Sequence, residues 1–218
     1  MVPAESDGYE GTATQPQPDA LDAGIRAYRR RIEPIGLNWG ATAEERTQPF
    51  PCDRYLSDAD DACYRAVTID APAPVVFRWL CQLKLAPYSY DWIDNWGRRS
   101  PQELVPGVEN LEVGQPVMLI FRLAEFEPDR HLTVVIERMR RFFGDVALTY
   151  LVVPESADRC RLVVKMLVNH PGPRLLRPLV RWIGPLGDLV MMRRQLLNLK
   201  RLAEREAARR STSPGPPA

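Results

Sequence analysis

The sequence has few of the residues that metal binding and nucleophilic catalysis most often use. It contains two histidines and four cysteines in 218 residues, and no two cysteines show the Cys-x-x-Cys spacing of a zinc or redox site. His131 and His170 have no partner at ligand spacing, and each lies beside a turn residue, which predicts that both are exposed. These shortages predict no metal, no cofactor and reduced thiols, as is usual in the cytoplasm.

Glycine-rich phosphate loops are also missing. Neither GxGxxG nor GxxxxGK occurs, so no nucleotide cradle is predicted. The formal net charge is only +1, so no overall field selects nucleic acid as a partner.

Long uninterrupted apolar runs are absent as well. The best candidate, residues 175–192, is broken by three charged residues and two prolines, which argues against a spanning helix. The first residues are acidic and lack the apolar region of a signal peptide, so a cytoplasmic location is expected.

What the chain does contain predicts one folded domain with an N-terminal extension. Residues 1–20 are rich in proline, glycine and acids and are predicted to be disordered, as is the tail 209–218. Residues 21–62 are expected to form a helix and an irregular arm, and residues 63–208 the domain itself.

Alternating apolar residues indicate the strands of this domain. They are expected at 63–70, 116–126, 131–139, 143–154 and 159–169. Because the connections among the last four are short, those strands are predicted to be antiparallel, with one face buried and the other in water.

Two helices complete the pattern. Residues 71–84 begin with prolines suited to a first helical turn, and residues 176–208 carry an apolar stripe long enough to cross a sheet. Arg194 and Gln195 are expected to lie mostly away from that stripe. The fold class is therefore α+β, with a curved antiparallel sheet around a long C-terminal helix and a hydrophobic cavity between them.

Side chains that point into such a cavity are candidate ligand contacts. This set consists of Trp79, Tyr88, Tyr90, Trp92, Leu132, Val134, Leu148, Tyr150, Leu162, Val164, Met166, Leu189 and Met192.

The segment 88–100, YSYDWIDNWGRRS, combines aromatic rings with fixed polar groups, as the mouth of a small-molecule pocket requires. If the protein is an enzyme, Tyr90 and Asp91 are the candidate catalytic residues, as hydrogen-bond donor and proton acceptor. The alternative is structural: Asp91 and Asp94 cap a short helix or pair with neighbouring arginines to fix the loop.

The chain resembles the START/Bet v 1-like (SRPBCC) superfamily of helix-grip proteins, in particular a bacterial polyketide cyclase and lipid-transport-like branch. The resemblance covers about residues 38–205 and rests on matched segments at 39–45, 49–53, 66–83, 88–100, 111–117 and 159–166. It departs from the branch at Cys52, where a glycine is expected, and in the short approach 84–87 to the tyrosines. The resemblance implies a deep cavity for lipids, polyketides or isoprenoids, in proteins that are cyclases, dehydratases or carriers.

We expect a carrier or sensor of a small hydrophobic ligand, bound by removing apolar surface from water. One alternative is a cyclase- or dehydratase-like enzyme. A second alternative is a protein that contacts an anionic membrane or an acidic partner through residues 171–210, which carry ten basic and three acidic residues. Ligand identity and oligomeric state stay open.

Overall fold

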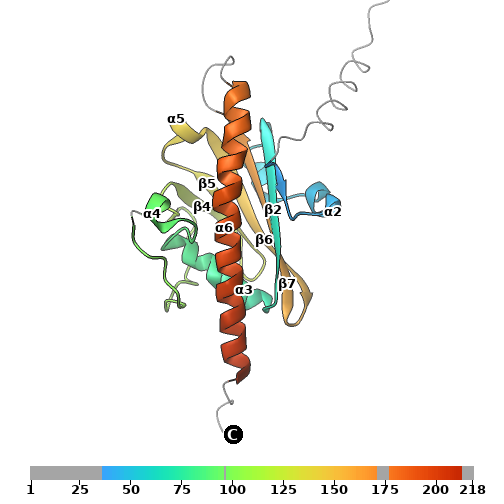
Figure 1. The fold of residues 1–218 in the computed structure, drawn as a ribbon, viewed down its shortest axis with the longest axis vertical. Helices are drawn as coiled ribbons and strands as arrows, with labels where there is room; N and C mark the ends of the chain where they lie inside the picture. The colour runs from blue at the N-terminus through green and yellow to red at the C-terminus, as the bar shows by residue number, and fades with distance from the viewer. Residues whose placement is uncertain (1–35, 96, 171–176, 213–218) are drawn as a thin grey trace, which may run out of the picture. The chain divides into compact units, whose positions relative to one another are not determined.

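A seven-stranded sheet lies at the centre of the computed structural model (Figure 1). The structure describes residues 36–95, 97–170 and 177–212, with only the backbone of 93, 94, 177–186 and 212. These residues fall in one structural unit, Pro34–Ala218. The predicted disordered segment 1–20 and residues 21–35 of the predicted helix and arm lie outside the described residues. The predicted disordered tail 209–218 is helical over residues 209–212, and its remainder lies outside the described residues.

The spatial order of the strands is β1-β2-β7-β6-β5-β4-β3. All neighbours pair antiparallel except β1 and β2, which are parallel. The strands are β1 Asn38–Trp39, β2 Asp61–Ile69, β3 Pro116–Val117, β4 Phe121–Glu127, β5 His131–Ile136, β6 Asp145–Ser156 and β7 Arg159–Asn169. The long central strands are those whose sequences alternate most regularly.

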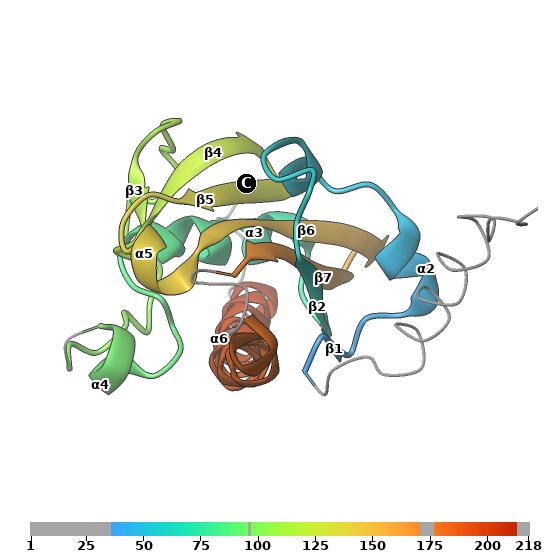
Figure 2. The ribbon, with the colours of Figure 1, turned by 90° about the horizontal axis from the view of Figure 1, so that it is seen from above.

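One long helix, α6, packs against one face of this sheet, which we call the inner face (Figures 1 and 2). It also contacts α3, which follows β2 in the chain. The helices are α2 Ala43–Thr47, η1 Pro51–Arg54, α3 Ala73–Cys81, η2 Gln82–Lys84, α4 Asp91–Asp94, α5 Arg140–Phe143 and α6 Arg177–Thr212. The predicted α+β helix-grip arrangement of a curved sheet and a long C-terminal helix is therefore confirmed, whereas the predicted cavity between them stays a prediction.

The inner face is apolar because every second residue of the central strands points toward α6. Val146, Leu148, Tyr150 and Val152 on β6 belong to the same buried cluster as Leu196 and Leu199 on α6. At about 25 cal/mol per Å² of apolar surface removed from water, this contact is the main source of stability in the fold.

The outer face departs from the sequence expectation, which placed it in water. Residues 41–56 of the arm cover it, and Phe50 and Cys52 pack with Val163 and Leu167 in a second buried cluster. The backbone N–H of Cys52 donates to Thr149 Oγ1 at 2.9 Å. Successive side chains of β7 therefore point into two different apolar cores, one on each face of the sheet.

Most predicted elements are found with small shifts at their ends. The strand predicted at 116–126 is two strands, β3 and β4, separated by a turn in which Met118 and Leu119 have positive φ. The last helix extends to Thr212 rather than 208. Within the described residues, no helix carries an apolar stretch long enough to cross a membrane.

Candidate ligand site between the sheet and the C-terminal helix

A polar layer crosses the otherwise apolar inner face. Arg65 on β2 is in register with Val164 on β7, and Val164 is in register with Tyr150 on β6. Arg65 and Tyr150 are both almost completely buried. Buried polar groups of this size require partners, and α6 supplies them.

The first partner is Gln195. Tyr150 donates its hydroxyl hydrogen to Gln195 Oε1 at 2.7 Å, and Gln195 Nε2 donates to the Pro87 carbonyl at 2.6 Å. The sulfur atoms of Met118 and Met192 lie 3.7 and 3.9 Å from the Tyr150 hydroxyl. Burial raises the pKa of Tyr150 well above its usual range, so the hydroxyl keeps its proton and acts as a donor.

The second partner is Asp188. An Arg65 Nη atom lies 2.9 Å from Asp188 Oδ2, and the Asp188 side chain is 20% exposed. Burial raises the pKa of Asp188 from 3.8 to about 6, although the Arg65 guanidinium acts in the opposite direction. The interior therefore holds a carboxyl group that titrates close to neutral pH.

Three residues near the Tyr150–Gln195 contact have strained backbone conformations. Tyr88, Met118 and Leu119 all have positive φ, a conformation that bulky side chains rarely adopt. Pro87, which accepts the bond from Gln195, directly precedes Tyr88, and the Tyr88 carbonyl accepts a bond of 2.8 Å from Asn198. Such strain persists only where the surroundings enforce it, and it is typical of binding sites.

Burial along the inner face is graded. In the layers beyond Tyr150 toward the end of β6, side chains such as Val152 and Leu162 are at most 1% exposed. In the opposite direction, Ile136, Val146 and Val168 are 7–9% exposed. Met166 is half-buried there, and Leu189 on α6 is also half-buried. We call this less buried part, at the start of β6, the open end of the interior.

The structure brings most of the predicted ligand contacts into one cluster. Those buried in the inner core are Trp79, Tyr88, Leu132, Val134, Leu148, Tyr150, Leu162, Val164 and Met192. Met166 packs against this core, whereas Leu189 is half-buried on α6. The Trp79 indole N–H is buried without a hydrogen-bond partner among the described residues.

The segment 88–100 divides into buried and exposed parts. Tyr88 is buried with its ring at the edge of Trp79, and its hydroxyl accepts a bond of 2.7 Å from Gln82 Nε2. Tyr90 is half-buried beneath the Arg194 guanidinium, whereas Trp92 is 76% exposed.

The Asp91 carboxylate accepts hydrogen bonds from the backbone N–H and the hydroxyl of Ser100, at 2.9 and 2.5 Å. This contact closes the segment into a loop. The hydrogen-bond partner of Asp91 is therefore Ser100, and not the neighbouring arginines that the sequence suggested as an alternative.

Two residues of the polar layer were not predicted from the sequence, and a third was predicted on the wrong side of α6. Arg65 and Asp188 were not candidates, and Gln195 was expected on the polar side of α6 but is buried. The available signal was spacing: Asp188 and Gln195 are seven residues apart, two helical turns, and so share a face.

The expectation that both histidines are exposed was also wrong for His170. Its side chain is 6% exposed, and Nε2 lies 2.8 Å from Asp61 Oδ2. His131 has a side chain only 13% exposed, flanked by Glu125 and Glu127.

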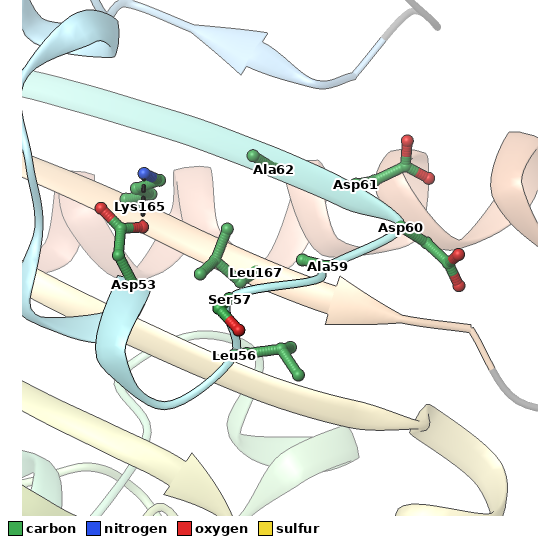
Figure 3. Close-up of a pocket in the computed structure, with 9 residues that line it drawn as sticks. All are labelled: Asp53, Leu56, Ser57, Ala59, Asp60, Asp61, Ala62, Lys165 and Leu167. Carbon is green, nitrogen blue, oxygen red and sulfur yellow. Dashed lines mark ion pairs between the residues drawn. The ribbon is translucent and has the colours of Figure 1, made fainter.

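Two pockets lie away from the inner core. One, of about 480 Å³, opens on the outer face between the arm and β2–β7; Lys165, which pairs with Asp53 at 2.6 Å, lines it together with Ala62 and Leu167 (Figure 3). The other, of about 440 Å³, adjoins it at Asp60. Their carboxylates already bind neighbouring groups: Asp61 contacts His170, and Asp60 accepts from the His170 N–H.

The described residues contain no group of three or more histidine, cysteine or acidic side chains placed to hold a metal ion. All four cysteines are free and buried, and burial raises the pKa of Cys63 to about 12. The thiols are therefore poor nucleophiles.

The arginines of α6 contact different neighbours rather than one another. Arg193 lies over the Trp39 ring, Arg194 over the Tyr90 ring, and Arg201 and Arg205 bond to Gln102.

Comparison with protein-family models gives no match, and comparison with curated protein sequences gives none either. Solved structures do match. A protein from Thermobifida fusca is 18% identical, over 65% of this chain and 94% of its own, with a TM-score of 0.40.

The ZhuI aromatase/cyclase from a Streptomyces species is 16% identical, over 71% of this chain and 97% of its own, with a TM-score of 0.41. The di-domain aromatase/cyclase BexL is also 16% identical, over 70% of this chain and 48% of its own, with a TM-score of 0.42.

Proposed function

We propose that this protein binds a small, mainly apolar molecule at the open end of the interior, with its oxygen atoms directed toward the polar layer. The observation that carries the proposal is the pairing of Tyr150 with Gln195 and of Arg65 with Asp188 inside an apolar core. A purely structural core gains little from buried charges, because desolvation offsets most of their attraction.

The neighbouring side chains suit such a ligand. Met118, Met166 and Met192 are unbranched and adjust to different shapes, and all three pack in the inner core. Met166 at the open end and Leu189 on α6 are both half-buried, so apolar surface there is not fully covered in the free protein. A ligand there gains affinity by covering that surface.

The proposal is tested by filling the open end. Leu189 is half-buried on α6, and its neighbour Val190 is 49% exposed, so the two positions allow the same bulk to be added inside or outside. We expect Leu189→Trp to weaken binding of a fluorescent fatty acid by about tenfold or more, since the indole occupies the ligand's space. Fluorescence titration gives both affinities.

Val190→Trp is the matched control and should bind as the native protein does. Equal affinities for the two variants, or no binding by the native protein of any fatty acid, sterol or polyketide-like probe, would contradict the proposal. Native mass spectrometry of the purified protein should also detect a co-purifying apolar molecule.

A second function is favoured by one observation, the Asp188 carboxyl with its pKa of about 6. Such a group exchanges protons near neutral pH, as general acid–base catalysis requires. In a cyclase-like enzyme, Asp188 would take or give a proton while Tyr150 donates a hydrogen bond to a ligand carbonyl. Asp188→Asn should then abolish cyclisation of a β-ketoester chain while the chain still binds. Unchanged turnover would exclude this role.

A further inference from the structure

The connection between β5 and β6 displays apolar side chains that the fold does not use. It contains the segment 137–143, ERMRRFF. Phe142 is 75% exposed, Phe143 is 50% exposed and Met139 is 49% exposed. Large aromatic side chains gathered at one exposed turn indicate a surface that meets an apolar partner.

The exposure follows from an ordered local structure. The N–H groups of Phe142 and Phe143 donate to the Met139 carbonyl at 2.9 and 3.1 Å, and Gly144 N–H donates to the Arg140 carbonyl at 2.8 Å. Met139 and Gly144, which bound α5, both have positive φ. The backbone therefore holds the two rings outward.

A fourth apolar side chain adjoins the turn. The Ile120 carbonyl accepts bonds from the N–H groups of Glu137 and Arg138, at 2.8 and 3.0 Å. Leu119, the residue before Ile120, is 50% exposed and also has positive φ. We call Leu119, Met139, Phe142 and Phe143 together the apolar tip.

Positive charge flanks the apolar tip. Arg138, Arg140 and Arg141 are exposed, against one acidic residue, Glu137, in the same segment. Arg140 pairs with Asp145. The side chains of Arg138 and Arg141 form no ion pair or hydrogen bond with the described residues, unlike those of Arg201 and Arg205 of α6, which bond to Gln102.

We propose that the apolar tip docks the protein onto an anionic lipid bilayer. Aromatic and aliphatic side chains would insert at the level of the headgroups, and the arginines would contact anionic lipid. Helices that anchor proteins at the membrane interface combine the same two contacts. A four-residue helix offers less surface than a stable dimer interface buries. The bilayer is the partner that fits a small protruding tip with a basic rim.

The position of the apolar tip in the fold agrees with docking onto a bilayer. Figure 1 shows α5 at the same end of the sheet as the first turns of α6. Ile136 and Val146, which border the open end of the interior, directly flank the connection that carries the tip. Docking would place the open end next to the bilayer, although the docking itself does not depend on the proposed ligand site.

The test uses the full chain with vesicles of phosphatidylcholine alone or with about 30 mol % phosphatidylserine, sedimented at low and high salt. We expect the native protein to bind the anionic vesicles and to bind less at high salt. Phe142→Ser with Phe143→Ser should lower binding about tenfold or more at either salt, because the apolar insertion is lost. Arg138→Gln with Arg141→Gln should remove most of the preference for phosphatidylserine.

The matched control is Arg209→Gln with Arg210→Gln, two exposed arginines on α6, which should bind as the native protein does. Circular dichroism checks that each variant is folded. No binding by the native protein, equal binding by the phenylalanine variant, or loss of binding only in the α6 variant would overturn the proposal. A solution dimer that disappears in the phenylalanine variant would also overturn it, by showing that the tip meets a second copy.

Discussion

Asp188 is a carboxyl group that its surroundings make a weaker acid. It lies on α6 against the sheet, and burial favours its neutral form while the Arg65 guanidinium favours its charged form. Arg65 is 1% exposed, so removing either partner leaves the other without its counterpart in a nearly dry site. The pair therefore adds little net stability to the fold.

The raised pKa predicts a particular pH dependence. Between about pH 4 and pH 6 the folded protein holds a proton on Asp188 that the unfolded chain has released, so this group's contribution to the free energy of unfolding falls as pH rises. Relative to Asp188→Asn, the native protein should lose up to about 3 kcal/mol between pH 4 and pH 7.

Urea unfolding of both proteins at several pH values measures this difference, and subtraction removes the titration of all other groups. A difference that stays constant over this range would mean that Asp188 titrates as an ordinary carboxyl.

At the scale of elements, the arm is fixed to the outer face by a close approach of two backbones. Arg161 on β7 bonds to Glu45 at 2.6 Å and also reaches the Gly40 carbonyl. Gly40 has φ of +77°, and a Cβ at this position would lie 2.3 Å from the Ala66 carbonyl oxygen. Only glycine satisfies both the dihedral angle and the space.

Gly40→Ala is therefore expected to destabilise the protein by about 3 kcal/mol or more, through strain and loss of the arm contact. Gly114→Ala is the matched control, since Gly114 also has positive φ but nothing lies within 4 Å of its added Cβ. The control should cost about 1 kcal/mol. Thermal and urea unfolding compare the two, and equal losses would show that the backbone contact with Ala66 is unimportant.

At the scale of the whole molecule, the sheet has apolar clusters on both faces. The inner cluster joins the sheet to α3 and α6, and the outer cluster joins it to the arm through Phe50 and Cys52. Lys165 lies over the rings of Phe50 and Tyr64 and pairs with Asp53, so this cation is also held by the arm. The arm is thus part of the folded domain.

If the arm is part of the folded domain, Phe50→Ala should lower the free energy of unfolding by about 3–5 kcal/mol, since Phe50 is 3% exposed. Phe142→Ala removes the same ring from an exposed position and should change stability by less than about 0.5 kcal/mol. Denaturant unfolding followed by circular dichroism gives both values. A small loss for Phe50→Ala would indicate an arm that unfolds without the sheet.

Much of this molecule was readable from residue patterns alone. Alternation of apolar residues predicted strands at 143–154 and 159–169, which are β6 and β7 in the structure, and a stripe of apolar residues predicted α6. The two-residue strand β1 was not predicted, and β3 was predicted only as part of one strand with β4, because a pattern with a period of two needs several repeats to be visible.

The sequence by itself determined the elements, their order and the apolar inner face, because those depend on the local period of apolar residues. Only the tertiary structure decided that Gln195 and Asp188 are buried opposite Tyr150 and Arg65, and that the arm covers the outer face. The physical reason is that a polar side chain or an irregular segment can be buried only where a distant part of the chain satisfies its hydrogen bonds and fills its space, and local pattern does not record that partner.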